Sequence, residues 1–292
     1  MVYIFAALYK EAEAVIQTFH LKKVCENSKF QEFINEEKGI CVVITGVGSI
    51  PAAVAVSCVC TKYGVREEDF LVNVGSCASA KAVGDIFFCN KITDENTGRT
   101  FYPDILFKHT FQECEVFTCG KIVSGGLLEM CQKQSGEQDQ ELQQGLVYDM
   151  EAAAIYQAGA YFFSPHQMSF LKIVSDNGQG DLVTPEQIEK VMGNASPMIA
   201  TYIEGLCEIA LKEKAQRKEF SDKLKEAIQR VCEDLHCSKT MELSLHQHFR
   251  YLMLTGVDVE KEIQKWYEDE TLPCKDRREG KKRFEELKAG LF

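Results

Sequence analysis

The sequence predicts an α/β fold: a three-layer α/β/α sandwich with a central mixed, mainly parallel sheet, plus a C-terminal all-helical appendage. Over some 210 residues, short apolar runs rich in β-branched residues alternate with segments whose apolar residues recur at helical spacing. This alternation is typical of a parallel sheet covered by helices. After Leu211 the apolar runs stop, and charged, helix-periodic segments follow. We therefore expect an α/β domain over residues 1–211 and a helical extension of unknown role over 212–292.

The first third of the chain contains three predicted strands and two predicted helices. Val2–Leu8 is an apolar run typical of a buried strand, and the segment after Lys10 has apolar residues at helical spacing. Ile40–Thr45 predicts a second strand. The helix expected over Pro51–Tyr63 begins with proline, which the first turn of a helix tolerates. Phe70–Val74 predicts the third strand.

The remainder of the larger domain continues the alternation. Gly84–Cys89 begins a fourth strand, and the alanine-rich segment Asp149–Phe162 favours a helix. Met168–Val174 is a further buried strand. Thr184 is placed to cap a long helix that runs to about Lys212.

Residues 212–292 show no strand pattern, and we interpret them as a helical appendage that could recruit a protein partner. Breaks are expected near Cys237-Ser238, Thr255-Gly256 and Leu272-Pro273. The basic stretch Cys274–Arg283 is interpreted as a solvated helix face. Apolar stripes are predicted at Leu224, Ile228, Val231 and Leu235, and at Leu243, Phe249 and Leu252.

Charge and cysteine content exclude several classes of function. The net charge is −11; residues 212–292 hold 18 basic and 17 acidic residues, which leaves 15 against 27 in residues 1–211. Such an acidic body argues against a nucleic-acid or anionic membrane surface as its partner, and no apolar run is long enough to span a membrane.

Thirteen cysteines, no secretory signal and no C-x-x-C pair point to reduced thiols in the cytoplasm. Zinc-ribbon and thioredoxin-like chemistry are thereby disfavoured.

Three carboxylates occur next to predicted strands. Glu11 lies in the first turn of a helix after Val2–Leu8, Glu151 opens the alanine-rich helix, and Asp176 follows Met168–Val174. Glu11 and Glu151 could equally stabilise the positive ends of their own helices. Because ligands collect at the carboxyl ends of strands in α/β sheets, we expect the three side chains to converge on one pocket.

Two glycine-containing turns accompany these acids. Gly46-Val47-Gly48 lies between a strand and a helix, where backbone N–H groups can face a ligand. It is neither a dinucleotide fingerprint nor a phosphate-binding loop, because the further residues of those motifs are missing. Asn73-Val74-Gly75-Ser76 would deliver a hydroxyl to the tip of a strand.

The pair His246 and His248 is not read as a metal site, since i and i+2 do not share a helix face.

In combination, these segments resemble the nucleoside phosphorylase and nucleosidase superfamily, and within it the methylthioadenosine/S-adenosylhomocysteine nucleosidases. The resemblance runs from Met1 to about Leu211 and leaves out the tail. The matching segments are Ala7-Leu8-Tyr9-Lys10-Glu11, Thr45-Gly46-Val47-Gly48, Asn73-Val74-Gly75-Ser76, Gly84-Asp85-Ile86, Val123-Ser124-Gly125, Asp149-Met150-Glu151-Ala152 and Val174-Ser175-Asp176.

The resemblance implies an N-glycosyl hydrolase with defined roles for its carboxylates. Glu11 would activate a water, Asp176 would protonate N7 of the leaving purine and so must hold a proton, and Glu151 would bind the ribose hydroxyls. Cleavage builds positive charge on the sugar and negative charge on the base, and these groups oppose both charges. The full substrate-binding set is Val47, Ser76, Cys77, Ala78, Leu128, Glu129, Met150, Glu151, Lys172 and Ser175.

The same resemblance implies a purine nucleoside substrate, most simply a 5′-modified adenosine such as methylthioadenosine or S-adenosylhomocysteine. It implies no cofactor and no metal, and a homodimer as the assembly. Ser76 would orient Asp176 or contact the base. Lys172 stands where the family usually has arginine and would pair with the carboxylates.

Departures from the family pattern leave the substrate open. Cys77-Ala78-Ser79 replaces a pair of glycines, Gly126 replaces an acid, and Leu128 stands where an aromatic ring often packs on adenine. Pro185-Glu186 lies where a phenylalanine is usual.

Two rival functions stay open. Phosphorylase relatives hold phosphate with arginines, whereas Asn73 and Glu11 occupy those regions here, so water is the favoured nucleophile. Lys10 is nevertheless a possible ligand for an anion, and the segment Gly75-Ser76-Cys77 is similar to the phosphorylase sequence. Phosphorolysis therefore stays open. The second rival is a nucleoside-binding or scaffolding protein with weak catalysis that associates with partners through its tail.

Overall fold

The computed structural model describes residues 1–24, 28–123, 146–216 and 220–289. The chain divides into two compact units, Met1–Ala215 and Gln216–Phe292. The division falls four residues beyond the expected boundary at residue 211, because the last helix of the first unit continues to Gln216.

The first unit is built on a ten-stranded sheet. Its strands are β1 (Val2–Ala6), β2 (Lys22–Lys23), β3 (Gln31–Asn35), β4 (Ile40–Ile44), β5 (Phe70–Ser79), β6 (Ile86–Asp94), β7 (Thr100–Phe101), β8 (Gln112–Thr118), β9 (Leu146–Asp149) and β10 (Met168–Asp176).

Four central strands, in the order β4-β1-β5-β10, run parallel to one another. Antiparallel strands flank them, β3 beside β4 and β6 beside β10. Strand β5 also pairs with β9, and β9 is connected through β8 and β6 back to β10. These five strands therefore close into a ring.

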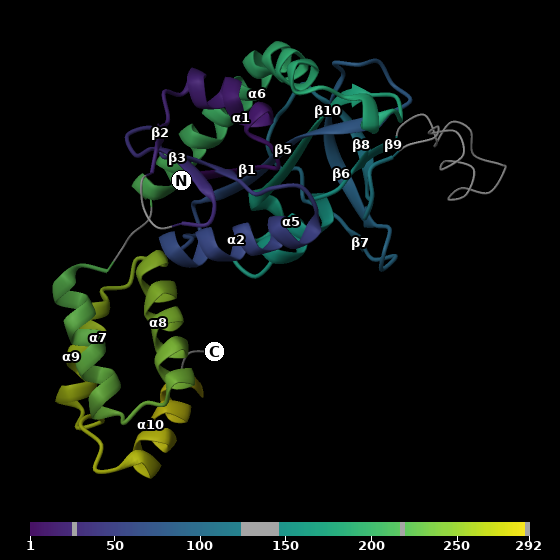
Figure 1. Cartoon of the computed structure of the whole chain (residues 1–292). Helices are drawn as coiled ribbons and strands as arrows, with labels where there is room; N and C mark the ends of the chain where they lie inside the picture. The colour runs from purple at the N-terminus through teal and green to yellow at the C-terminus, as the bar shows by residue number, and fades with distance from the viewer. Residues whose placement is uncertain (25–27, 124–145, 217–219, 290–292) are drawn as a thin grey trace. The chain divides into compact units, whose positions relative to one another are not determined.

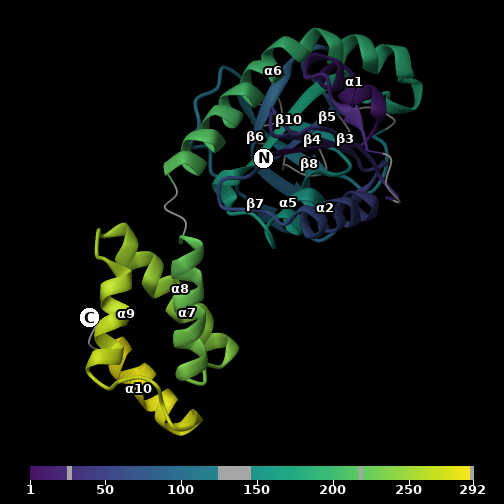
Figure 2. The ribbon, with the colours of Figure 1, turned by 90° about the vertical axis from the view of Figure 1, so that its left-hand side faces the viewer.

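Helices cover both faces of the sheet, which confirms the predicted layers. They are α1 (Tyr9–Thr18), α2 (Ser49–Tyr63), α5 (Ala152–Gly159) and α6 (Pro185–Gln216), with short 3-10 turns at Pro165–Gln167 and Gly180–Leu182. Helices α1 and α6 lie on one face and α2 and α5 on the other, as Figure 1 and Figure 2 show. No helix in the described part of the chain is both long and apolar enough to cross a bilayer.

Alternation along the buried strands divides the interior into two cores. In β1, Ile4 packs with residues of α1 and α6, whereas the next residue, Phe5, packs with residues of α2 and α5. Successive side chains of a strand point to opposite faces, so a strand buried on both faces has to be apolar throughout. This is why these segments appear in the sequence as continuous apolar runs.

Several strands lie outside the predicted ones. The short or edge strands β2, β3 and β7 are too brief or too polar to give a clear apolar signal. Strand β8 was also missed, although its buried residues Cys114, Val116 and Thr118 alternate with more exposed ones. Strand β5 continues five residues past the predicted end at Val74, because β10 and β9 pair with its last residues.

The second unit consists of helices with a core of their own, as predicted. They are α7 (Asp222–Asp234), α8 (Lys239–Leu254), α9 (Val259–Glu268) and α10 (Arg277–Ala289), and their ends agree with the predicted breaks. Leu224, Ile228, Val231 and Leu235 are buried together. The second predicted stripe was wrong at Leu243, which is exposed. Leu245 takes the inward position, because it stands at i−4 from the buried Phe249.

Candidate active site

A cavity of about 240 Å³ lies at the carboxyl ends of β1, β5, β9 and β10. Three carboxylates, Glu11, Glu151 and Asp176, line it together, although they are far apart in the sequence. The other lining residues are Ala7, Leu8, Val47, Ser76, Cys77, Ala78, Ile122, Val123, Tyr148, Met150, Ser175, Gly180, Val183 and Ile188.

Glu11 is held by three hydrogen bonds to its carboxylate. The backbone N–H of Leu8 donates to Oε2 at 3.0 Å, and the backbone N–H and hydroxyl of Ser76 donate to Oε1 at 2.7 and 2.6 Å. The Leu8 bond closes the first turn of α1 and the Ser76 bonds reach across to β5. Ser76 therefore orients Glu11, whereas the sequence suggested that it would orient Asp176 or contact the base.

Glu151 faces the turn between β4 and α2. Its Oε1 accepts a hydrogen bond of 2.7 Å from the backbone N–H of Gly48. Gly48 has φ +100°, a conformation that favours glycine and turns this N–H toward the cavity. Burial, reinforced by the nearby charge of Asp149, raises the pKa of Glu151 to about 7.

Asp149 and Lys172 form an ion pair beneath the cavity. Lys172 Nζ lies 2.7 Å from Asp149 Oδ2, and both side chains are almost completely buried. Lys172 was predicted to bind substrate, but it is not among the described residues that line the cavity. It pairs with Asp149 instead. Burial lowers the pKa of Lys172, but the carboxylates of Asp149 and Glu151 outweigh it and the net shift is upward.

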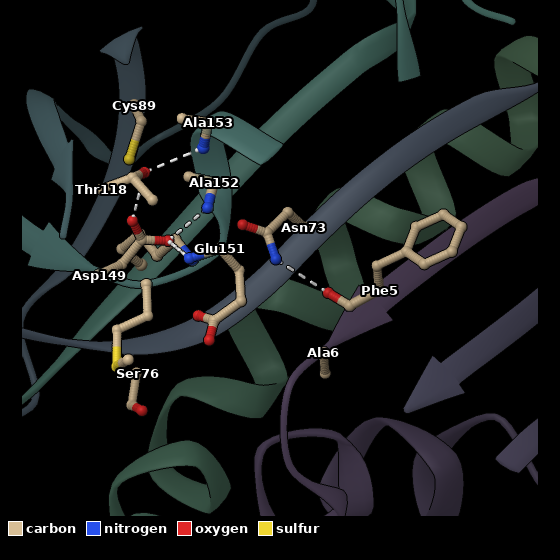
Figure 3. Close-up of polar contacts among 12 residues, drawn as sticks. Phe5, Ala6, Asn73, Ser76, Cys89, Thr118, Asp149, Glu151, Ala152 and Ala153 are labelled. Carbon is tan, nitrogen blue, oxygen red and sulfur yellow. Dashed lines mark hydrogen bonds and ion pairs between the residues drawn. The ribbon is translucent and has the colours of Figure 1, made fainter. Parts of the chain in front are cut away.

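Asp149 also fixes the start of α5. Its Oδ2 accepts from the backbone N–H groups of Glu151 and Ala152, and its Oδ1 accepts from the hydroxyl of Thr118 at 2.7 Å. Thr118 in turn accepts from the backbone N–H of Ala153. Figure 3 shows Asp149 and Thr118 gathered at this helix start, with the Glu151 side chain projecting away from it.

Asp176 lies at the end of β10, where a β-bulge shifts the register with β5 between Val174 and Asp176. The backbone N–H groups of Gly178 and Gln179 both donate to Oδ1 at 2.9 Å. Ser175 Oγ lies 2.9 Å from Oδ2 and 3.1 Å from the carbonyl oxygen of Cys77. Bulges re-aim side chains beside active sites, and here the bulge brings both Ser175 and Asp176 to the cavity.

Gly75 lies close to two of these groups. A Cβ at this position would lie 3.2 Å from Lys172 Nζ, which is tighter than most contacts of a Cβ, and 3.6 Å from Glu11 Oε1, an ordinary contact distance. A side chain at position 75 would therefore require a small shift of Lys172 Nζ.

The remaining predicted residues divide into two groups. Val47, Cys77, Ala78 and Met150 line the cavity, whereas Leu128 and Glu129 lie outside the described residues. Burial raises the pKa of Cys77 well above its usual value, so this cysteine is not placed to act as a thiolate nucleophile.

Sequence reasoning missed the apolar walls of the cavity. Leu8, Ile122, Val183 and Ile188 line it, and no motif marks them, because an aliphatic residue beside a strand end resembles any core residue. Of these four residues, Leu8 could have been predicted, because it belongs to the same short segment as Glu11.

The cavity lining carries negative charge without a facing cation. Among the described lining residues there is no lysine or arginine. Lys10, the nearest basic residue in the sequence to Glu11, is bound to Glu13 at 2.8 Å and Glu189 at 2.6 Å. Within the described part of the chain, no group of three or more His, Cys, Asp or Glu side chains is arranged to hold a metal ion.

Comparisons with known proteins establish the fold. The structure is similar to a 5′-methylthioadenosine/S-adenosylhomocysteine nucleosidase from Neisseria meningitidis in complex with methylthio-immucillin-A, with a TM-score of 0.56 and 17% identity over 70% of this chain and 98% of that one. The corresponding nucleosidase from S. pneumoniae, with a transition-state inhibitor, gives a TM-score of 0.56 and 18% identity over 70% and 99%. A futalosine hydrolase from Helicobacter pylori gives 0.55 and 11% over 70% and 97%.

No protein-family model and no curated protein matches the chain. The structural likeness nevertheless confirms the predicted fold, which is the fold of these solved nucleosidases.

Proposed function

We propose that the chain is a nucleosidase that hydrolyses the N-glycosidic bond of a purine nucleoside and releases the free base. The observation that carries this proposal is the convergence of Glu11, Glu151 and Asp176 on one cavity whose described lining contains no lysine or arginine. Similarity to solved nucleosidases supports it.

In the proposed reaction, Glu11 accepts a proton from the attacking water while the water oxygen bonds to C1′ of the ribose. The bond from C1′ to the base breaks, and its electron pair leaves with the base. Asp176 gives a proton to N7 of the purine, which neutralises the leaving group. Positive charge that develops on the sugar is opposed by the nearby carboxylates.

Ser175 can support Asp176 in both states that this role requires. A hydroxyl has one proton to donate. When Ser175 donates it to the Cys77 carbonyl oxygen, Ser175 Oγ can accept from a protonated Asp176 Oδ2; when Asp176 has given up its proton, Ser175 can donate to Oδ2 instead. Because Oδ1 already accepts two backbone N–H groups, Oδ2 is the oxygen that would carry the proton.

The apolar walls favour a nucleoside with an apolar 5′ substituent. Leu8, Val183 and Ile188 line the cavity with Glu11, and aliphatic side chains suit an alkylthio group better than a charged one. Two similar structures contain methylthio-type ligands or inhibitors. We therefore favour a 5′-alkylthio adenosine such as methylthioadenosine as the substrate; S-adenosylhomocysteine shares the thioether but ends in a charged amino acid, for which these walls supply no partner.

We further propose a homodimer in the cytoplasm. Val47 lines the cavity, and Ile50 and Val54 follow it on α2; all three are exposed, Ile50 by 79%. Apolar side chains gathered at a cavity mouth are typical of a protein interface. The cysteines of the described residues are all free, which fits a reducing compartment.

The test is an assay of free-base release from a panel of 5′-modified nucleosides, with and without inorganic phosphate. Hydrolysis predicts release of base and free sugar at the same rate in both conditions. Formation of a sugar 1-phosphate only when phosphate is present would replace our proposal by phosphorolysis. Binding of nucleosides without turnover would indicate the scaffolding alternative.

Two substitutions connect this assay to the site. Asp176→Asn and Glu11→Gln should each lower kcat by at least about 100-fold with little change in nucleoside affinity, because proton transfer belongs to the transition state. Glu13→Gln, in the same helix but outside the cavity lining, is the control and should keep kcat near that of the parent. Normal turnover in Asp176→Asn would exclude Asp176 as the acid.

A further inference from the structure

Asn177 follows Asp176 directly, is exposed, and is not among the described residues that line the cavity of the three carboxylates. Its side-chain amide nevertheless makes two short hydrogen bonds. Nδ2 donates to the carbonyl oxygen of Ser79 at 2.6 Å and to that of Lys81 at 2.7 Å. A side-chain NH2 group has two protons to donate, so both are used. The amide therefore ties the residue after Asp176 to the end of β5.

The bonds of Asn177 complete an attachment of β10 on both sides of its β-bulge. Before the bulge, the backbone N–H of Gly84 donates to the carbonyl oxygen of Val174 at 2.9 Å, and the N–H of Val174 donates to that of Asp85 at 2.9 Å. After the bulge, the Asn177 side chain binds the first part of the same connection, where β5 ends and the chain runs on to β6. Asp176 lies between these two attachments.

Asn177 also stands inside the group of donors that holds Asp176. The backbone N–H groups of Gly178 and Gln179 both donate to Asp176 Oδ1 at 2.9 Å. Gly178 has φ +86°, a conformation that favours glycine and turns the chain back toward Asp176. Because Asn177 connects Asp176 to both donors, the place where its side chain is fixed sets where these two N–H groups point.

The amide of Asn177 is the side-chain link between this loop and the sheet. Of residues 177–180, Gly178 and Gly180 have no side chain, and the side chain of Gln179 makes no hydrogen bond with the described part of the chain. Gly180 is held through its backbone, whose N–H donates to the carbonyl oxygen of Val123 at 3.3 Å. Removal of the Asn177 amide would therefore detach the first half of the loop from β5.

The two N–H groups on Asp176 Oδ1 suit a group that has to become negative during a reaction. When Asp176 gives its proton to the purine, a full charge forms on its carboxylate, and N–H donors that already point at it stabilise that charge. Donors on a loop that is free to move would first have to be ordered, and this cost would be added to the barrier. Fixing the loop therefore favours proton transfer without any contact with the substrate.

We propose that Asn177 is a positioning residue of the proposed hydrolysis. Its amide holds the loop 176–180 against the end of β5, which keeps the N–H groups of Gly178 and Gln179 on Asp176 Oδ1 and leaves Oδ2 to carry the proton. This role rests on the proposed function, since Asn177 acts only through Asp176 as the acid.

Asn177→Leu tests this role, because leucine has a similar size and no N–H donor. The full chain is assayed with the nucleoside of the panel that the parent hydrolyses fastest. We expect kcat to fall about 10- to 100-fold, the loss typical of a catalytic group displaced by about 1 Å. KM should stay within about 2-fold of the parent value, since Asn177 is not among the described lining residues.

Amide hydrogen exchange reports the same role without any substrate. It is followed at Gly178 and Gln179 by nuclear magnetic resonance of the full chain labelled with ¹⁵N. Both N–H groups should exchange about 5- to 30-fold faster in Asn177→Leu than in the parent, which is the factor expected from the loss of one or two hydrogen bonds.

Two further variants separate the amide from the size of the side chain and from a general loss of stability. Asn177→Gln keeps both N–H donors on an exposed side chain and should recover most of the kcat that Asn177→Leu loses. Asn90→Leu is the matched control. Asn90 is also exposed, and its Nδ2 donates to Glu113 Oε2 at 2.9 Å, between β6 and β8. Neither residue is among the described ones that line the cavity, so this variant should keep the kcat of the parent.

Three results would overturn the inference. They are a kcat of Asn177→Leu equal to that of the parent, a loss of kcat that Asn177→Gln does not reduce, and exchange at Gly178 and Gln179 that stays as slow as in the parent. A parent that releases no base from any nucleoside of the panel would instead refute the proposed function, and the role of Asn177 with it. The two failures are distinguishable, because the kinetic comparison requires an active parent.

Discussion

Glu151 receives a hydrogen bond from Gly48 while the carboxylates of Asp149 and Glu11 raise the electrostatic cost of its own charge. A protein built only for stability would place a neutral residue there. The proposed role explains the charge, because a carboxylate can accept two hydrogen bonds from a ribose whereas a protonated carboxyl has lost one acceptor position.

The raised pKa of Glu151 predicts a pH dependence of activity. Since the pKa is about 7, Glu151 is protonated below that pH, and kcat/KM should rise through about pH 7 as the carboxylate forms. A pH profile of kcat/KM for the parent and for Glu151→Gln measures this. The variant should be weaker than the parent above pH 7, approach it below that pH, and lack this rise; a profile of unchanged shape would remove Glu151 from ribose binding.

Thermal unfolding gives a control on the sign of the same effect. Folding raises the pKa of Glu151 from about 4.5 to about 7. The folded protein therefore loses stability as the pH rises through this range, because the buried carboxyl group becomes charged. Glu151→Gln should therefore unfold at a higher Tm than the parent at pH 8, and the difference should shrink toward pH 4.5.

At the scale of elements, the site depends on how α5 begins. Asp149 at the end of β9 accepts the backbone N–H groups of Glu151 and Ala152, and Lys172 from β10 balances its charge. The direction of the Glu151 side chain is therefore set by a strand, a helix start and a neighbouring strand together.

Breaking the pair of Lys172 and Asp149 should cost stability. Lys172→Met leaves the Asp149 carboxylate buried without its counter-charge, and we expect a loss of about 3 to 5 kcal/mol in the free energy of unfolding. Urea unfolding measures it. The double variant Lys172→Met with Asp149→Asn should recover part of the loss, because asparagine keeps the oxygen that caps α5. A loss below about 1 kcal/mol in Lys172→Met would show that the pair contributes little.

The existence of strands buried on both faces was predictable from the sequence, although β5 and β10 both run past their predicted ends. Met168–Val174 and its following Asp176 stood out because apolar runs stop abruptly at a polar residue. The bulge at Val174 was not predictable, since it depends on the pairing of β10 with β5. The role of Ser76 was predicted wrongly for a similar reason. Its hydrogen-bond partner, Glu11, is set by the packing of α1 on β5, which no local sequence pattern indicates.

At the scale of the whole molecule, the chain contains separate cores. The first unit buries apolar residues on both faces of its sheet, and the second buries a cluster that includes Leu224, Phe249 and Trp266. The change in composition after Leu211 predicted a change in architecture. The end of α6 was harder to place, because charged residues are compatible with both the last turns of a helix and a connection.

Separate cores predict that residues 1–216 fold without the helical extension. A chain ending at Gln216 should unfold cooperatively and release base with the same kcat/KM as the full chain. Calorimetry and the base-release assay measure both properties. Aggregation of the shortened chain, or loss of its activity, would show that the extension is required by the first unit.

The absence of a lysine or arginine among the described residues that line the carboxylate cavity has a consequence for selectivity inside a cell. Nucleotides such as AMP share the base and sugar of the proposed substrate but carry a phosphate dianion at the 5′ position. The two carboxylates that are ionised in the proposed reaction, Glu11 and Glu151, would repel that dianion. The enzyme that we propose would thus leave the abundant nucleotide pool intact and would work on rare thioether nucleosides without competition from it.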